Sequence, residues 1–354
     1  MPENSPVTTT TTTTTTLTTT TLTTMTPIER RHLVASWGDH AQAGAMLQPG
    51  LRTVDVIGPG GRAFAACTRA LGSTIVLGEP VGDTDGARAD VVAAVLDDDP
   101  HAIFFQVRPA FAALLTTRFG LRVTPIGTEP IIDVAAFTLR GRRRQSVRTA
   151  LRHARAHGVT VTELDGDDTL HTGAIAHAAY AWERTRRRRQ IRFLVPPLHH
   201  RVPGLSRTFV AKHGDAVLGF VTFDALSEAG HIRGYTPSVS RASTQFRAGL
   251  WYVLMAHALQ QFQREGIASV NLGLVPLSRP SLAASTTRSP ASPGALLPLL
   301  RLLRVVGRPV YPFAGIEHAK GRLGGEPVMS FLGHRRALPL GALLGTWWRT
   351  FVGP

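Results

Sequence analysis

Short apolar runs alternate with longer segments of helical spacing along the first half of the chain. The runs RTVDVIG (52–58), STIVLG (73–78) and AIFFQV (102–107) are bounded by Gly, Pro or Asp, as buried strands commonly are. Between them, GARADVVAAVLDDD (86–99) has apolar residues at helical spacing, and PAFAALLTTRFG (109–120) adds Pro at its start and Gly at its end. This half of the chain is therefore predicted to be a mixed α/β fold.

The second half of the chain repeats this alternation. Helical patterns at 142–158 and 173–189 are followed by a hairpin at 207–225 with its turn at His213, Gly214 and Asp215, a strand at 230–237, an amphipathic helix at 249–266 and a strand at 267–274. The order strand, strand, strand, helix, strand thus occurs in both halves. We therefore predict an α/β (α+β) protein of two similar tandem domains, residues 27–165 and 166–335, each a mixed sheet flanked by helices.

The two ends of the chain depart from this pattern. Residues 1–26 are mostly threonine, with too little apolar surface to offset the entropy of ordering, so a disordered tail is expected. The start has neither the basic nor the apolar region of a signal peptide. The segment 295–307 and the amphipathic C-terminal tail 336–354 are too short to span a bilayer or are interrupted by Arg and Pro, so they could lie on a membrane without crossing it.

An excess of positive charge, almost all of it arginine, marks the sequence. The formal net charge is +15, from 39 basic and 24 acidic residues, and only Lys212 and Lys320 are lysines. This balance favours an anionic partner, which could be RNA, an acidic lipid or a phosphorylated substrate. The candidates for tRNA or phosphate contacts are one face of the helix at 142–158 and a later arginine run, namely Arg144, Arg148, Arg152, Arg155, Arg187 and Arg188. A solvated helix face is the alternative interpretation of this charge.

The sequence contains no clear cofactor or metal motif. Cys67 is the only cysteine, which excludes an intramolecular disulfide and any multi-cysteine metal site and fits a reducing cytoplasm. The loop GEPVGD (78–83) matches neither a P-loop nor a GxGxxG fingerprint, so we interpret it as a turn with Glu79 as a candidate substrate contact. The segment 241–251 precedes a helix, where acetyltransferases bind coenzyme A, but it lacks their compact glycine pattern. We expect no cofactor and no metal ion.

Five ordered segments carry a resemblance to a known family. They are IVLGEPVGD (75–83), FFQV (104–107), IIDVAAFTLRGRRRQSVRTALRHARAHG (131–158), VNLGLVPLS (270–278) and YPFAGIEHAKGRL (311–323), and they span roughly residues 50–335. Together they resemble the C-terminal catalytic domain of phosphatidylglycerol lysyltransferase, the multiple peptide resistance factor. The resemblance implies two tandem acyltransferase-like (GNAT-type) folds. It also implies transfer of an aminoacyl group from aminoacyl-tRNA to a lipid hydroxyl at the cytoplasmic membrane face.

The resemblance points to three residues for the transfer step. One lysine of the family's Lys-x-Lys element remains as Lys320, and Arg322 stands in place of the other. Aminoacyl transfer from an activated ester needs orientation, help with a proton and stabilisation of a tetrahedral oxyanion. Lys320 and Arg233 are the catalytic candidates for the cation, and His231 is the candidate for moving the proton. The alternative is that Lys320 is a surface lysine and that His231 packs in a strand.

The strand that ends in Asn-Leu-Gly is the expected place for substrate binding. Asn271 would face a cleft between the halves near the two candidate cations, and Gly273 would allow close backbone approach. Tyr235 is a further candidate substrate contact. Pro276 would end the strand pairing and leave 279–295 as a mobile flap. The alternative is that Asn271 only caps a turn.

The leading hypothesis is a cytoplasmic aminoacyltransferase, able to sit peripherally on the inner face of the cell membrane. It would use aminoacyl-tRNA as co-substrate and act on a phosphatidylglycerol-like lipid or another hydroxylated acceptor. Two alternatives stay open because a fold does not dictate a function. One is a coenzyme A-dependent N-acyltransferase, and the other is a catalytically degenerate protein that binds lipid or RNA through its basic faces.

Overall fold

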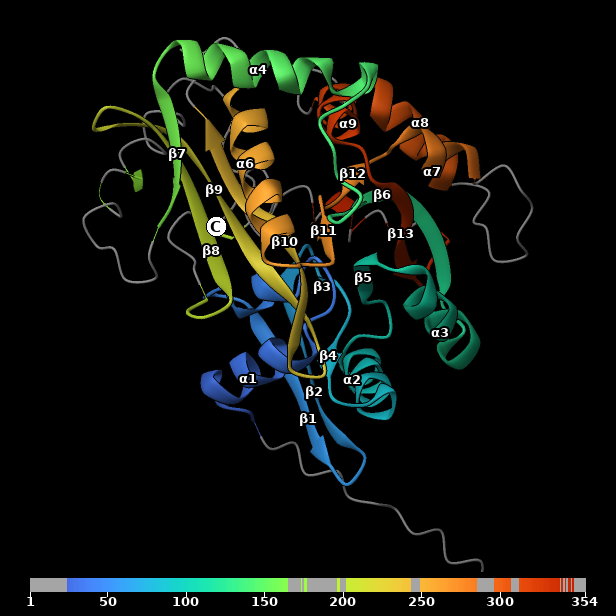
Figure 1. The fold of residues 1–354 in the computed structure, drawn as a ribbon. Helices are drawn as coiled ribbons and strands as arrows, with labels where there is room; N and C mark the ends of the chain where they lie inside the picture. Colours follow the sequence, from blue (N-terminus) through green and yellow to red (C-terminus); the bar gives the residue numbers. More distant parts are fainter. Residues whose placement is uncertain are drawn as a thin grey trace, which may run out of the picture.

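The computed structural model describes most of the chain as alternating strands and helices (Figure 1). The described residues are 24–164, 202–242, 249–284, 296–306 and 312–337, with isolated positions at 173, 175, 176, 196, 197, 339, 341, 343, 344 and 346. The helices are α1 (Pro27–Trp37), α2 (Asp85–Asp98), α3 (Pro109–Phe119), α4 (Gln145–Ala156), α6 (Leu250–Arg264), α7 (Arg279–Ala284), α8 (Leu296–Val306) and α9 (Phe313–Leu323), with 3₁₀ turns η1 (Gly44–Leu47) and η2 (Arg142–Arg144).

Thirteen strands of the described residues form one mixed sheet. They are β1 (Arg52–Gly58), β2 (Gly61–Ala70), β3 (Ser73–Leu77), β4 (Val81–Gly82), β5 (Ile103–Val107), β6 (Arg122–Asp133), β7 (Val159–Glu163), β8 (Ser206–His213), β9 (Ala216–Glu228), β10 (His231–Ala242), β11 (Ser269–Asn271), β12 (Val275–Pro276) and β13 (Glu326–His334). Their order is β1-β2-β3-β5-β13-β6-β11-β10-β9-β8-β7, with β4 paired to β2 and β12 paired to β6. The predicted α/β class is confirmed.

The two arms of the sheet are built in the same order. Strands β1, β2 and β3 pair antiparallel, α2 follows, and β5 then pairs parallel to β3. Strands β8, β9 and β10 likewise pair antiparallel, α6 follows, and β11 pairs parallel to β10. This repetition matches the order strand, strand, strand, helix, strand expected in both halves, although β2 was not among the strands predicted in the first half. The division into domains at residue 165 stays a prediction.

The centre of the sheet combines strands from both ends of the chain. Strand β13 pairs antiparallel with both β5 and β6, and β6 in turn pairs antiparallel with β11. A strand from the end of the second half therefore completes the arm built by the first half. Because β6 and β13 join the two arms, side chains on β6 lie where residues from both halves can meet.

Helices cover the sheet and one of them lies across its end. Helix α6 packs on β8, β9 and β10, α2 packs on β1 and β2, and α3 packs on β6 and β13. Figure 1 shows α4 lying across one end of the molecule, at the top of the view, with α9, α8 and α7 beside it. No helix of the described residues is both long and apolar enough to cross a membrane. The core beneath α6 is aromatic, with Phe262 in edge-on contact with Phe209 and Phe223.

Six of the thirteen described strands are not predicted by the sequence pattern, namely β2, β4, β6, β7, β12 and β13. Pro276, expected to end the strand pairing, instead lies in β12 opposite Gly127 of β6. Strand β2 reads GRAFAACTRA, and its alanines are typical of helices. Strands β6 and β13 contain prolines, which usually exclude a strand from the middle of a sheet. Pro125 is accommodated because the pairing of β6 with β13 shifts register there, between Ser330 and Phe331. The predicted helix at 173–189 lies mostly outside the described residues.

We predict that Gly127→Ala destabilises the fold. A Cβ atom on Gly127 of β6 would overlap the carbonyl oxygen of Val275 and lie 2.8 Å from Leu274 Cδ1, so the segment leading into β12 would have to move. Overpacking of this kind costs about 1–3 kcal/mol. Urea unfolding should show this loss, whereas Gly58→Ala, whose Cβ would meet nothing within 4 Å, should change stability by less than about 0.5 kcal/mol. Equal stability of the two variants would contradict the prediction.

Candidate active site

Strand β11 ends in a turn that the side chain of Asn271 holds in place. The Asn271 Oδ1 atom accepts a hydrogen bond of 2.8 Å from the backbone N–H of Gly273, and Gly273 has φ of 73°, a left-handed conformation that suits glycine. On its other side, Asn271 Nδ2 donates to Glu129 Oε2 at 2.7 Å. Asn271 thus caps the turn, as one of the two alternatives expected, and also binds a carboxyl group of β6, while its role as a substrate contact stays a prediction.

Lys320 of α9 reaches the carbonyl oxygens of that turn. Its Nζ atom donates to Gly273 O at 3.0 Å and to Leu274 O at 2.9 Å, so two of the three donors of the ammonium group are used on adjacent carbonyls. Burial lowers the pKa of Lys320 to about 8, although the charge of Glu129 acts in the opposite direction. The structure therefore brings Lys320 and Asn271 to the same turn at Gly273, as expected, and places the lysine within electrostatic range of the buried Glu129.

Glu129 is the centre of a buried hydrogen-bond network that sequence reasoning missed. Its side chain is almost fully buried, and its two oxygens accept from Asn271 and from Gln106 Nε2, the latter at 3.0 Å. Gln106 in turn accepts from Gln42 Nε2 at 2.7 Å. The backbone of Gln106 has φ of 69°, which is uncommon for a residue other than glycine and clusters at functional sites. The only sequence signal was a glutamate between Thr128 and Pro130 in an otherwise apolar stretch.

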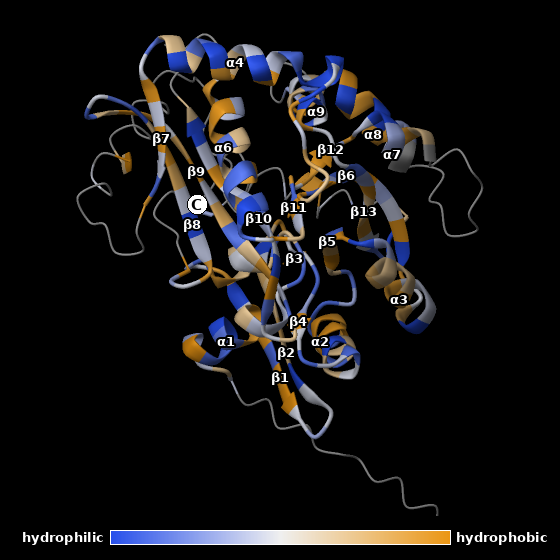
Figure 2. Cartoon of the chain, in the orientation of Figure 1, coloured by the Kyte–Doolittle hydropathy of each residue, from blue (hydrophilic) through white to orange (hydrophobic). Residues whose placement is uncertain are grey.

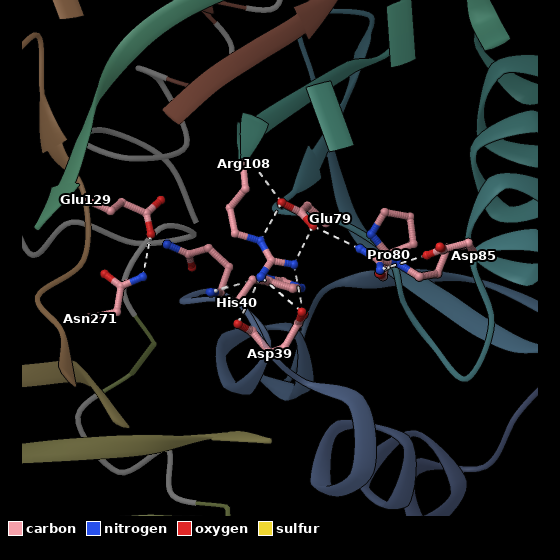
Figure 3. Close-up of polar contacts among 10 residues, drawn as sticks. Asp39, His40, Glu79, Pro80, Asp85, Arg108, Glu129 and Asn271 are labelled. Carbon is pink, nitrogen blue, oxygen red and sulfur yellow. Dashed lines mark hydrogen bonds and ion pairs between the residues drawn. The ribbon is translucent and has the colours of Figure 1, made fainter. Parts of the chain in front are cut away.

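A second group of charges, around Glu79, lies on the first half of the chain. Figure 3 shows Arg108 between Glu79 and Asp39. Arg108 Nη2 lies 2.8 Å from Glu79 Oε2 and 2.9 Å from Asp39 Oδ1, and Arg88 Nη2 lies 2.9 Å from Glu79 Oε2. Burial alone would raise the pKa of Glu79, but the hydrogen bonds and charge of Arg108 lower it to about 2. Glu79 was expected as a substrate contact, but both arginines form ion pairs with its carboxylate.

His40 connects this charged group to the Glu129 network. Its Nδ1 atom accepts a hydrogen bond from the backbone N–H of Gln42 at 3.3 Å, and Figure 3 draws His40 next to Arg108 and Asp39. Burial lowers the pKa of His40 to about 4, with the charge of Glu79 opposing the shift. His40 is therefore neutral near pH 7. His40 thus lies within electrostatic range of Glu79 and Arg108 and is hydrogen-bonded to the backbone of Gln42, whose side chain begins the network that ends at Asn271.

Three residues expected in the site lie elsewhere. Arg233 has a side chain that is 63% exposed and pairs with Glu228 at 3.7 Å, close to the β9–β10 turn. His231, the first residue of β10, is also exposed rather than packed in the sheet. Tyr235 belongs to the core, where its ring stacks on Phe262 with centroids 4.6 Å apart. Arg233 contacts Glu228, whereas Asn271 and Lys320 meet at the turn after β11, so the expected convergence of the three side chains is not observed. Tyr235 packs in the core, where a substrate contact was expected.

The arginine face of α4 is divided between backbone contacts and solvent. Arg144 donates to Leu323 O at 3.1 Å and to Thr138 O at 2.8 Å, and Arg148 donates to Leu139 O and Gly141 O. These contacts hold the loop before α4 and the end of α9. Arg152 and Arg155 are exposed, so of the four arginines predicted on this helix face, these two are the ones available to an anionic partner. Arg187 and Arg188 lie outside the described residues.

Two further sequence expectations concern mobile or ligand-binding segments. The prediction of a mobile flap at 279–295 is wrong for residues 279–284, because they form α7 and Ser281 is fully buried. Residues 285–295 lie outside the described residues. Residues 243–248 of the segment considered for coenzyme A and most of the tail 336–354 also lie outside them. Within the described ranges, no group of three or more His, Cys, Asp or Glu side chains could hold a metal ion.

Comparison with known proteins identifies the family. The family model for the C-terminal domain of phosphatidylglycerol lysyltransferase matches residues 31–323, which include Glu129, Asn271 and Lys320. The chain belongs to this family. Its members are classed by that model as lysyltransferases, so this chain belongs to a transferase family. No curated protein matches the sequence closely enough for comparison.

Solved structures share the fold of this family member. A C-terminal domain assigned to a lysylphosphatidylglycerol synthetase of Agrobacterium fabrum has a TM-score of 0.74 and 19% identity, covering 93% of this chain and 99% of that one. L-PGS from Bacillus licheniformis has a TM-score of 0.72 and 17% identity, covering 92% and 97%. A conserved protein of unknown function from Bacteroides thetaiotaomicron has a TM-score of 0.59 and 11% identity, covering 88% and 98%. At these identities, the likeness establishes the fold alone.

We predict that Lys320 titrates far below an ordinary lysine. The chain has only two lysines, so a ¹³C-lysine-labelled sample of the Lys212→Arg variant gives one lysine NMR signal, that of Lys320. Its titration midpoint should lie near pH 8 rather than near 10.5, because burial disfavours the charged amine. Adding Glu129→Gln should lower the midpoint further, since the charge of Glu129 raises the pKa of Lys320. A midpoint within about one unit of the ordinary value would contradict this description.

We predict that Glu79→Gln destabilises the protein in a pH-dependent way. The pKa of Glu79 is about 2 when folded and 4.5 in the reference state, so its stabilisation is present above pH 4.5 and is lost as pH falls toward 2. Removing the charge leaves two arginines without their buried partner, which costs about 3–5 kcal/mol. Urea unfolding at about pH 7 and about pH 3.5 should show the gap between variant and wild type shrinking at low pH.

A matched control is available on the same arginine. Asp85 pairs with Arg88 at 3.3 Å but its side chain is 88% exposed, so Asp85→Asn should cost less than about 1 kcal/mol. If Glu79→Gln cost no more than Asp85→Asn, or if its cost did not change with pH, the ionised, paired state assigned to Glu79 would be wrong.

Proposed function

We propose that this protein transfers an aminoacyl group from an aminoacyl-tRNA to a hydroxyl group of a phosphatidylglycerol-like lipid. Membership of a lysyltransferase family supports the reaction class. The observation that carries the proposal is the position of Lys320. Its ammonium group is held on the Gly273 and Leu274 carbonyls, on the turn that Asn271 caps and within electrostatic range of Glu129, at the join between the two arms of the sheet.

The chemistry requires a stabilising cation more than a nucleophilic enzyme group, because the donor is already an activated ester. The acceptor hydroxyl oxygen forms a bond to the aminoacyl carbonyl carbon, and the bond from that carbon to the ribose oxygen of the tRNA breaks. The proton of the hydroxyl moves to the ribose oxygen that leaves. Negative charge develops on the carbonyl oxygen in between, and a preorganised donor lowers that barrier most. Two donors of Lys320 bind carbonyls, and the third is assigned to this oxyanion.

Asn271 and Glu129 are assigned to orientation. Asn271 uses its amide to bind Glu129 and its oxygen to hold the turn, so it fixes the carbonyls that position Lys320. Arg143 and Arg144 support the same group from the other side, since they donate to Gly321 O at 2.7 Å and Leu323 O at 3.1 Å at the end of α9. These two arginines are positioning residues for Lys320.

The exposed arginines of α4 are assigned to the tRNA. Arg152 and Arg155 point to solvent on the helix next to α9, which supports contacts to phosphates that position the donor without reading its sequence. Such contacts make binding weaker as salt increases.

We predict that Lys320→Ala lowers turnover by about 100-fold or more, the range for losing one oxyanion donor, while leaving the fold intact. The assay incubates purified protein with charged total tRNA and a membrane lipid extract and follows label in the lipid. The rate should fall as pH rises through about 8, since the ammonium form of Lys320 is the one that stabilises an oxyanion. Lys212→Ala, which removes the only other lysine, is the control and should keep normal turnover.

Other outcomes of that assay would replace the proposal. Label transferred from an acyl-coenzyme A but not from tRNA would assign the protein as an N-acyltransferase. RNA or lipid binding with no turnover of either donor would assign it as a binding protein. Transfer that increases above pH 8 in the wild type and is lost in Lys320→Ala would make Lys320 a general base instead of a cation.

A further inference from the structure

Helix α8 presents apolar side chains to solvent. Leu302, Leu303 and Val305 are 57%, 47% and 58% exposed, and α8 contributes three of the eight large apolar residues that are exposed within the described part of the chain. Single exposed leucines are ordinary on protein surfaces, but several on one short helix mark an interaction surface. The sequence of α8, LLPLLRLLRVV, contains no acidic residue.

The opposite side of α8 is anchored to the protein, so the exposed side has a defined direction. Leu300 is buried, and Arg304 pairs with Glu317 of α9 at 2.7 Å and donates to the carbonyl oxygen of Leu277. Arg301 donates to Leu282 O of α7 at 3.0 Å. Since these contacts attach α8 to both α7 and α9, the helix cannot turn its leucines inward without losing them.

The position of α8 relates it to the candidate active site. Figure 1 shows α7, α8 and α9 together at the same end of the molecule as α4, whereas α1 and the β1–β2 hairpin occupy the opposite end. Figure 2 shows hydrophobic and hydrophilic residues mixed along α8 and mainly hydrophilic ones along α4. Helix α9 carries Lys320 and is bound directly to α8 through Arg304. A partner on the exposed side of α8 would therefore meet the protein next to the site.

We propose that α8 is the surface through which this protein docks on an anionic lipid bilayer, with Leu302, Leu303 and Val305 entering the interfacial region. The inference rests on the proposed function, because a lipid acceptor has to reach Lys320 from its membrane. Helix α8 has 11 residues, too few to span a bilayer, and combines apolar side chains with arginine in the manner of helices that lie in the interface. The exposed Arg279 and Arg301, and the net charge of +15, complement anionic headgroups.

Charge also argues against a second copy of the chain as the occupant. In a symmetric pairing of two α8 helices, the exposed Arg301 of both copies would lie at one interface, and neither helix has an acidic residue to meet it, since Glu317 of α9 is already paired with Arg304. An anionic bilayer offers the apolar layer and the negative charge at the same time.

The experiment measures cosedimentation with vesicles of phosphatidylglycerol and phosphatidylcholine, and with vesicles of phosphatidylcholine alone. Wild-type protein should bind the anionic vesicles, and added salt should weaken the binding without abolishing it. The double variant Leu302→Gln and Val305→Gln should lower the partition coefficient about tenfold or more, because two large apolar contacts are lost while glutamine keeps the helix. The matched control is Ile28→Gln, since Ile28 is 67% exposed on α1 at the opposite end of the molecule, and it should bind like wild type.

Two results would overturn the docking proposal. One is equal binding of wild type and the double variant. The other is a wild-type dimer in sedimentation velocity that the double variant dissociates, with no vesicle binding by either, which would assign the face to self-association.

Failure of the proposed function has a different signature. A short-chain phosphatidylglycerol supplied below its micelle concentration needs no docking, so the double variant should label it at the wild-type rate. If neither protein labels that lipid while vesicle binding still depends on Leu302 and Val305, the transfer reaction is wrong and the docking surface stands.

Discussion

The buried carboxyl group of Glu129 must find its hydrogen-bond donors inside the protein, and this requirement ties the two arms of the sheet together. One donor is Gln106 at 3.0 Å, from β5, and the other is Asn271 at 2.7 Å, from β11. A buried carboxyl group without hydrogen-bond donors would cost several kcal/mol, which is a large part of the free energy of unfolding of a typical domain. The arms therefore cannot shift relative to each other without breaking this group. The unusual backbone conformation of Gln106 is tolerated because its side chain is held at both ends.

The placement of Lys320 follows from the same junction. Asn271 binds Glu129 with its amide and shapes the turn with its oxygen, and the turn then directs the Gly273 and Leu274 carbonyls at the lysine. Burying an ammonium group is unfavourable, which is why its pKa is lowered, and the carbonyl dipoles and the charge of Glu129 offset part of that cost. The cation is thus located from the sheet side by β11 and from the helix side by the arginines that hold the end of α9.

Sequence reasoning predicted the features that depend on a local pattern of residues. It missed the features that depend on contacts between residues far apart in the sequence. The apolar runs of β1, β3 and β5 and the glycine after Asn271 are local signals, and the family resemblance added Lys320. Glu129 and Asn271 are separated by 142 positions, so only the pairing of β6 with β11 reveals that they meet. Arg144 and Arg148 lie on the predicted basic face of a helix, but no helical pattern can say that their guanidinium groups turn back to backbone carbonyls. Arg233 was placed on a strand beside β11, yet its position at the hairpin end directs it to solvent.

The distribution of charge explains why the surface around Lys320 is basic in a protein whose formal net charge is +15. Several acidic side chains are partly or fully buried and each is bound by an arginine, as in Arg30 with Asp55, Arg108 with Glu79, and Arg207 with Glu163 and Glu265. Because these pairs use acidic residues in the interior, the surplus of arginine is carried by the surface, including the exposed Arg152 and Arg155 of α4. Helix α9 contacts that basic helix and is joined to α8 by the Arg304–Glu317 pair, while α8 carries the exposed apolar side chains. In the proposed reaction, the polyanionic donor and the lipid acceptor would approach Lys320 over chemically different neighbouring surfaces, so that neither would have to displace the other to reach it.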